Sequence, residues 1–287
     1  MDGNWLALLG VKGGPAIRPG SNMPTSLLLR LGGRTILVDV GLGTARAVCA
    51  QGLALTEIDL IVVTHLHSDH CLELGPLLHT AWTAGLSRPV PVIGPSGLAT
   101  LWDGFLGSMA FDIALRIEDE GRPPLADLVS LRTITDGTIH KADGVTIEAM
   151  RNDHPPIEES FALRLTAGDT RVVLSGDTAP MEAMVPFAAG ADLLVHEAML
   201  EREVARMIAG HPNRDGRLLD HILRSHTPAS EAGRIAAEAG VGALALHHLV
   251  PDGLEGIGEA DWAREVRRHF DGPLHVGRDG MRLDLPG

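Results

Sequence analysis

The sequence predicts an α/β fold in which two β-sheets are covered by helices. Short apolar runs rich in β-branched residues recur along the 287-residue chain, and helical stretches lie between them. Strands that occur both early and late, separated by helices, favour two packed sheets, because each element must bury an apolar face. No Pro- or Ser-rich linker, repeat or low-complexity tract divides the chain. We therefore expect a single domain over residues 1–287.

Ten apolar runs carry the strand signal. The expected strands are Trp5–Leu9, Leu27–Leu31, Thr35–Val38, Leu60–Val63, Val90–Ile93, Val145–Ala149, Phe161–Leu165, Arg171–Leu174, Leu193–Val195 and Ala243–Leu246. The clearest helix is expected over Pro228–Ala239. Thr227 is a plausible N-cap, Pro228 suits the first helical position, and Gly240 follows the last turn.

Residues 95–135 fit a simple two-sheet arrangement least well. Much of the scarce aromatic content lies in or near this stretch, at Trp82, Trp102, Phe105 and Phe111. We expect a helical insertion here that covers the active site or forms a dimer contact. For any one of these side chains, a place in an ordinary helix core is the simpler expectation.

The charge balance argues against a polyanionic substrate. The formal net charge is −13 and the pI is near 5.5. Lys12 and Lys141 are the only lysines, and no basic run occurs. Proteins that bind phosphate backbones draw much of their affinity from clustered Lys and Arg. Nucleic acid is therefore disfavoured as a partner, although arginines gathered on one face would reverse this expectation.

The N-terminus has no basic segment followed by an apolar one, and no apolar run reaches ~18 residues. Cys49 and Cys71 are too few for a disulfide framework, and Cys71 is expected to be a small buried hydrophobe. We expect a cytoplasmic protein without a membrane partner, and a homodimer.

A cluster of three histidines and an aspartate occupies residues 65–70, directly after the apolar run Leu60–Val63. Imidazoles that leave water at the end of a buried strand each need a partner. A divalent metal satisfies all of them, and imidazole with carboxylate suits zinc, with manganese or iron as alternatives. A solvated histidine-rich loop would explain neither the interspersed aspartate nor the further candidate ligands downstream.

This pattern, His-x-His-x-Asp-His, resembles the signature of the metallo-β-lactamase superfamily. Ile36-Leu37-Val38-Asp39 precedes it, and further motifs follow in that family's order: Asp153-His154, Ser175-Gly176-Asp177-Thr178, His196-Glu197, Ser225-His226-Thr227 and Leu246-His247-His248. They resemble most closely the branch that contains tRNase Z and the metallo-β-lactamase-type arylsulfatases. The resemblance covers nearly the whole chain and implies a four-layer αβ/βα sandwich with the metal site at one edge, where the two sheets meet.

The resemblance also implies two divalent metal ions. Their ligands would be His65, His67 and His154 for one ion, Asp69, His70 and His248 for the other, and Asp177 as a bridge. His65 and His67 alternate along an extended segment, so both point to the same side. His247 competes with His248 for the last position, which the strand-end alignment gives to His248. Asp39 would support the ligand loop from behind.

Two such ions, roughly 3.5–4 Å apart, share a hydroxide that attacks phosphorus, sulfur or a carbonyl carbon. Asp69 would orient or deprotonate this nucleophile. A leaving alkoxide needs a proton, and His226 with Glu197 behind it resembles the pair that supplies one in tRNase Z-like enzymes. The alternative for His226 is a surface histidine at a helix start.

The expected function is hydrolysis of a small phosphodiester or sulfate ester by a metal-bound hydroxide. One alternative is a tRNA 3′-processing endonuclease, which the charge balance and the absence of a long Gly/Pro-rich arm disfavour. The other is a lactonase or β-lactamase acting on a carbonyl. The chain has no tyrosine for a lactonase site and carries Asp177 where many β-lactamases need cysteine. A non-catalytic binding protein is disfavoured because no ligand position is lost.

Overall fold

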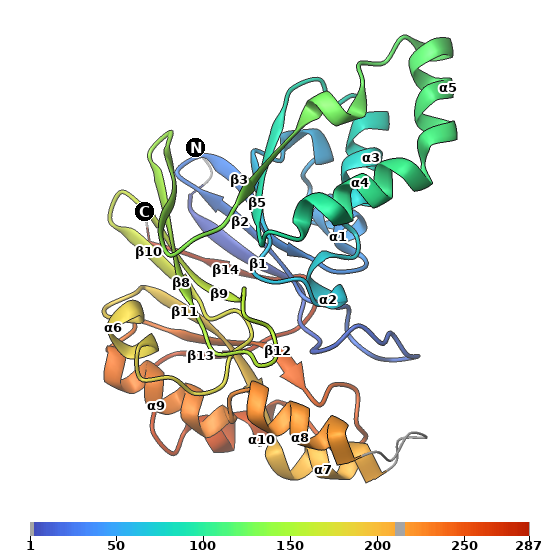
Figure 1. Ribbon diagram of the computed structural model, residues 1–287. Helices are drawn as coiled ribbons and strands as arrows, with labels where there is room; N and C mark the ends of the chain where they lie inside the picture. The colour runs from blue at the N-terminus through green and yellow to red at the C-terminus, as the bar shows by residue number, and fades with distance from the viewer. Residues whose placement is uncertain (1–2, 210–215, 287) are drawn as a thin grey trace.

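Two seven-stranded β-sheets pack face to face in the computed structural model, which describes residues 3–209 and 216–286 (Figure 1). The first sheet holds, in spatial order, β14 (Met281–Asp284), β1 (Trp5–Gly10), β2 (Ser26–Leu31), β3 (Arg34–Val40), β4 (Leu60–Val62), β5 (Val90–Gly94) and β6 (Val129–Thr133). The second holds β13 (Leu274–Val276), β12 (Leu244–Val250), β11 (Leu193–Met199), β10 (Thr170–Leu174), β9 (Phe161–Ala167), β8 (Val145–Arg151) and β7 (Gly137–Ala142).

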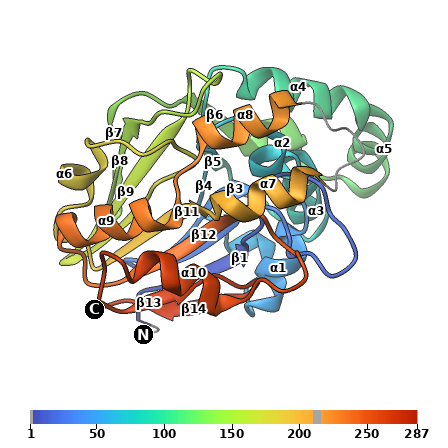
Figure 2. The same ribbon diagram turned by 90° about the horizontal axis from the view of Figure 1, so that it is seen from below.

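Helices cover the outer face of each sheet (Figures 1 and 2). The first sheet carries α1 (Thr44–Ala50), α2 (Ser68–Cys71), α3 (Leu74–Thr83), α4 (Leu98–Ser108) and α5 (Ala110–Glu120). The second carries α6 (Met184–Ala188), α7 (Glu201–Ala209), α8 (Gly216–Ser225), α9 (Ala229–Ala239) and α10 (Glu259–Val266). Short 3₁₀ turns occur at Leu55–Glu57 and Leu125–Leu128. The predicted four-layer αβ/βα sandwich is confirmed.

The apolar core fills the space between the two sheets and between each sheet and the helices that cover it. Successive side chains of a strand point to opposite faces, and β1 is buried on both. Leu6 and Leu8 join the cluster between the two sheets, whereas Trp5, Ala7 and Leu9 join the cluster under α1, α3 and α4. Burial on both faces explains why these strands read as continuous apolar runs in the sequence.

The predicted strands are all present, with ends shifted by a few residues, but β6, β7, β13 and β14 were not predicted. The predicted helix begins one residue late, because Pro228 is its N-cap. The Thr227 hydroxyl does not cap the helix and instead donates to the carbonyl oxygen of Thr178. Gly240 ends the helix in the left-handed conformation, as expected, with φ of 62°.

The expected helical insertion over residues 95–135 is shorter than predicted. α4 and α5 form it, but Val129–Thr133 is strand β6, paired in parallel with β5. Trp102 is buried in the core, whereas Phe111 is 84% exposed, so the expectation of a core position is wrong for Phe111. By length and apolar composition no single described helix would cross a membrane, although α4 and α5, bent by 66°, pass that test as a pair.

Trp82 anchors α3 against the first sheet and should dominate the stability of this layer. It is 1% exposed, and its indole nitrogen donates to the carbonyl of Pro123 at 2.9 Å. We expect Trp82→Ala to lower the free energy of unfolding by about 3–5 kcal/mol, through lost burial and a residual cavity. Trp82→Phe should lower the free energy of unfolding clearly less than Trp82→Ala does. Urea denaturation of both variants measures this, and equal losses would contradict the packing argument.

Candidate metal centre

The seven predicted ligands converge at one edge of the sandwich. They lie after β4 (His65 and His67), in α2 (Asp69 and His70), after β8 (His154), after β10 (Asp177) and in β12 (His248). β3 pairs in parallel with β4, and β11 pairs in parallel with both β10 and β12. This pairing brings the carboxyl ends of these strands together. Such ends are the usual position of a functional site in an α/β fold.

His65, His67, His154 and Asp177 form the first group. One ligand atom from each lies within 4.8 Å of all the others. Nδ1 of His67 is 3.1 Å from Nε2 of His65 and 3.1 Å from Nε2 of His154. His65 and His154 are fully buried, and His67 is half-buried. The convergence of His65 and His67, expected from their spacing, is therefore present.

Asp69, His70 and His248 form the second group, also within 4.8 Å of one another. Asp177 lies between the two groups. Its Oδ2 is 3.0 Å from Nε2 of His248 and 3.2 Å from Nε2 of His70. The same oxygen is 3.7 Å from Nε2 of His65 in the first group. A carboxylate in this position can reach an ion in either group.

The hydrogen bonds behind the histidines leave ligand lone pairs facing inward. Nδ1 of His70 donates to Oδ2 of Asp39 at 2.7 Å, and Nδ1 of His154 donates to the carbonyl of Ser225 at 2.9 Å. Each ring then presents Nε2 as an acceptor toward the cluster. Nε2 of His70 has no hydrogen-bond partner among the described residues, although it is buried.

The charges in the cluster also fit a cation. Burial lowers the pKa of His154 to about 4, which keeps it neutral and able to bind a metal. Burial alone would raise the pKa of Asp177, but the imidazoles of His248 and His70 hold it well below its usual range. Burial lowers the pKa of His70, but the carboxylates of Asp177 and Asp39 outweigh it and raise this pKa well above its usual range, so the cluster favours positive charge. The residues present therefore fit the divalent ions that the resemblance implies.

Two β-bulges aim Asp39 and His248 at this cluster. Pairing of β2 with β3 passes from Val40 directly to Val38, so Asp39 is the extra residue. Pairing of β11 with β12 passes from His247 to Leu249, so His248 is extra there. Both have positive φ, 58° for Asp39 and 42° for His248, which is uncommon without glycine. Bulges of this kind re-aim a side chain next to a site.

The same bulge decides between the two adjacent histidines. Nε2 of His247 hydrogen-bonds the carbonyl of Gly10 at 2.8 Å, away from the cluster. Nε2 of His248 faces Asp177 and lies 3.3 Å from Oδ2 of Asp69. The geometry therefore favours His248, as the strand-end alignment did.

His226 and Glu197 form a buried pair beside the second group. Nδ1 of His226 is 3.0 Å from Oε2 of Glu197, and the imidazole is stacked on His248 with ring centroids 5.2 Å apart. His226 is only 6% exposed, so its reading as a surface histidine is wrong. Burial disfavours its charged form, but the Glu197 carboxylate outweighs this and raises the pKa of His226 to about 9. The pairing with Glu197 therefore favours the protonated form of the ring.

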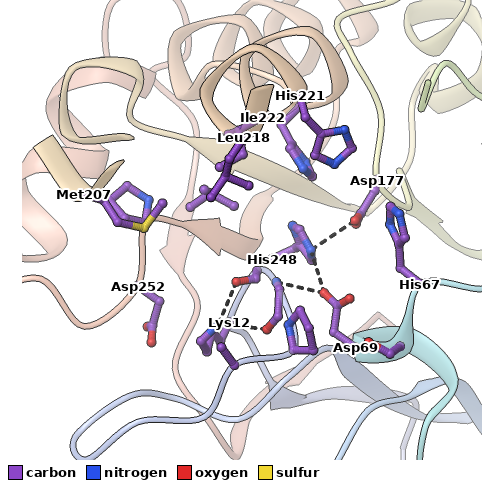
Figure 3. Close-up of a pocket in the computed structure, with 18 of the residues that line it drawn as sticks. Lys12, His67, Asp69, Asp177, Met207, Leu218, His221, Ile222, His248 and Asp252 are labelled. Atoms are coloured by element: carbon purple, nitrogen blue, oxygen red, sulfur yellow. Dashed lines mark hydrogen bonds and ion pairs between the residues drawn. The ribbon is translucent and has the colours of Figure 1, made fainter. Parts of the chain in front are cut away.

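A cavity of about 340 Å³ opens beside the cluster (Figure 3). It is lined on one side by Asp69, Asp177, His226 and His248, and on the other by apolar side chains of α7 and α8. None of its described lining residues comes from 95–135, so the expectation that this segment covers the site finds no support. His221 lines the cavity, although its position in the sequence matched no motif.

Comparison with known proteins shows the family of this chain. The family model described as "Anti-Pycsar protein Apyc1" matches residues 6–209. "Ribonuclease Z" of Mycolicibacterium gilvum (strain PYR-GCK) is 34% identical over 289 residues, covering 98% of this chain and 96% of that protein. The chain belongs to the family of this model. It lies within the tRNase Z branch of the metallo-β-lactamase superfamily, as the Ribonuclease Z relative indicates.

Solved structures of this superfamily share the fold over the whole chain. The metallo-beta-lactamase fold protein YhfI from Bacillus subtilis superposes with a TM-score of 0.71 at 23% identity, covering 99% of this chain and 100% of that one. Human tRNase Z, short form (ELAC1), gives a TM-score of 0.69 at 20% identity, covering 99% and 100%. Membership and ligand cluster together make the chain a metal-dependent hydrolase acting on ester bonds.

Asp39 should set metal affinity without binding metal itself. Its carboxylate accepts from Nδ1 of His70 and from the backbone N–H of Thr64. We expect Asp39→Asn to weaken metal binding about 10- to 100-fold, because it no longer fixes the His70 ring as firmly. Competition with a chromogenic chelator measures this. Asp143, an exposed aspartate that also has positive φ, provides the control Asp143→Asn. Equal metal affinity in the two variants would refute the role of Asp39.

Proposed function

We propose that the protein is a metal-dependent phosphodiesterase that releases a sugar hydroxyl, with RNA as its substrate. The observation that carries this proposal is the buried His226–Glu197 pair beside Asp177 and His248. A nitrophenolate leaves readily without a proton, whereas a sugar alkoxide needs one. A protonated imidazole at this position supports a substrate whose leaving group is an alkoxide.

We assign the seven ligands to two divalent ions, zinc in the first instance, with Asp177 shared between them. When bound, such ions stabilise negative charge on phosphoryl oxygens and lower the pKa of water. Asp69 is placed to orient the attacking water, because its Oδ2 is fixed by the N–H of Gly14 at 2.8 Å. Nε2 of His226 protonates the leaving oxygen, while Glu197 holds Nδ1.

RNA is supported by the relatives, which carry the name Ribonuclease Z and match the chain from end to end. This evidence outweighs the net charge, which counts the whole surface and not the site. A small phosphodiester is the second candidate. It is favoured by the size of the cavity, about 340 Å³, which matches a small ligand. Sulfate esters and carbonyl substrates remain predictions with less support.

Cleavage assays with the metal-quantified protein test both candidates. The substrates are a precursor tRNA with a 3′ extension, a dinucleotide, bis(p-nitrophenyl) phosphate and p-nitrophenyl sulfate, each with a chelator control. Chelator-sensitive cleavage of the precursor at the 3′ end, faster than of the dinucleotide, is expected. Turnover of the dinucleotide alone would favour the small-phosphodiester candidate, and turnover of the sulfate ester alone would refute both.

A further inference from the structure

Lys12 is a buried lysine that the reaction described above does not use. It directly follows Val11 after β1 and is only 3% exposed. Its ammonium donates to the carbonyls of Gly13 and Gly14, both at 2.8 Å. Lys141, the only other lysine, is exposed on β7. Burying an ammonium is costly without a compensating anion, so the burial of Lys12 calls for an explanation.

Within the described residues, no carboxylate lies within 4.0 Å of the Lys12 ammonium. Two neutral carbonyls satisfy two of its three N–H groups. Burial lowers the pKa of Lys12, while the more distant Asp252 and Asp69 raise it. The side chain thus has hydrogen-bonding capacity and positive charge that its own surroundings only partly satisfy.

The ammonium lies next to the metal centre. The N–H of Gly14, whose carbonyl Lys12 binds, donates to Oδ2 of Asp69. Lys12 lines the same cavity as Asp69, Asp177 and His248, and Figure 3 places it beside them. An anion bound in this cavity would therefore share it with both the lysine and the metal ligands.

The far side of the cavity is apolar. Met207 and Ile208 of α7 and Leu218 and Ile222 of α8 line it, and Figure 3 draws this wall away from Asp69. The described lining contains no aromatic side chain apart from histidine. A flat, weakly polar group fits an aliphatic wall of this kind, and the same cavity is lined elsewhere by Lys12 and the metal ligands.

We propose that this cavity is a nucleotide-binding subsite, in which Lys12 binds a phosphate oxygen of the substrate and the α7–α8 wall holds the adjoining base. The subsite rests on the proposed function, because it takes a nucleoside phosphodiester as the substrate. Lys12 binds the phosphate by a charge-assisted hydrogen bond, which is stronger than a bond to a neutral group. The wall selects a base by burying its faces from water.

Spectroscopy of the two lysines tests the phosphate contact without any turnover. Metal-loaded protein containing lysine labelled with carbon-13 at Cε should give separate signals for Lys12 and Lys141, which Lys141→Met assigns. Titration with adenosine 5′-monophosphate is expected to shift the Lys12 signal and leave that of Lys141 in place. Adenosine alone should shift Lys12 much less. An unmoved Lys12 signal at millimolar nucleotide would overturn the proposal.

Variants test the two halves of the subsite separately. Lys12→Met should weaken binding of adenosine 5′-monophosphate about 10- to 100-fold, with Lys141→Met as the control. Leu218→Ala should weaken the nucleotide several-fold while leaving ribose 5-phosphate unchanged. Leu223, 41% exposed on the same helix, provides the control Leu223→Ala. If Leu218→Ala weakens both ligands equally, the base does not bind the wall.

These outcomes are distinct from failure of the proposed function. If the precursor tRNA and the dinucleotide are not cleaved but the nucleotide binds through Lys12, the subsite stands and the reaction assignment fails. If cleavage occurs and Lys12→Met keeps kcat/KM for the dinucleotide within twofold, the reaction stands and the subsite fails. If Lys12→Met does not fold, Lys12→Arg replaces it in the binding assay. The titration of the unmodified protein, followed by lysine spectroscopy, still tests the phosphate contact.

Discussion

Asp177→Ala is expected to remove at least one metal ion per chain and to reduce turnover by about 10³-fold or more. Oδ2 of Asp177 lies near both ligand groups, 3.0 Å from Nε2 of His248 and 3.7 Å from Nε2 of His65. Removing it leaves the facing imidazoles without a shared anion. Metal content by atomic spectroscopy, together with kcat/KM for bis(p-nitrophenyl) phosphate, measures the effect.

The matched control is Asp169→Ala, in the exposed turn that precedes β10. It should keep both metal content and turnover, because it changes an exposed aspartate at the end of β10 opposite to the ligands. If Asp177→Ala retains two ions and normal activity, the assignment of the shared ligand is wrong. Far-ultraviolet circular dichroism spectra typical of the folded protein for both variants exclude simple unfolding as the cause.

His226→Ala is expected to slow cleavage of a dinucleotide about 10²- to 10⁴-fold, the range of a positioned general acid. Bis(p-nitrophenyl) phosphate should lose far less, because nitrophenolate leaves without a proton. The difference between the two substrates is the informative quantity. Loss of the ring also removes the stacking on His248, which would slow both substrates alike.

Glu197→Gln separates these effects. It keeps a side chain of the same size against Nδ1 of His226 but removes the charge that holds the imidazole protonated. We expect a loss confined to the dinucleotide and smaller than that of His226→Ala. Equal slowing of both substrates by His226→Ala would assign the histidine a structural role in place of proton donation.

The seven metal ligands were predicted from the resemblance to a family motif, and some of them also follow strands that are largely buried. Such strands read as unbroken apolar runs, and polar residues directly after them, as at His65 and Asp177, stand out. β6 and β7 escaped prediction because they are mostly exposed edge strands without that signal. Phe111 was wrongly expected to lie in a helix core, because composition does not tell which helix lacks a neighbour to cover it.

Other features depend on pairing or on tertiary contacts that no local pattern encodes. Which of His247 and His248 faces the cluster is decided by one unpaired residue in the register of β12. Lys12 and His221 reach the cavity through loops and helices distant in sequence. The only signal for Lys12 was its rarity among the basic residues, and rarity alone does not place a side chain.

The two bulges carry a consequence for how this protein can be engineered. Asp39 and His248 occupy a backbone conformation that costs a non-glycine residue on the order of 1–3 kcal/mol. Glycine at either position would relax the chain and remove a group that the metal centre uses. A screen that rewards heat resistance alone would therefore select against activity at these two positions. Thermostable variants of this hydrolase should be sought with both positions held fixed.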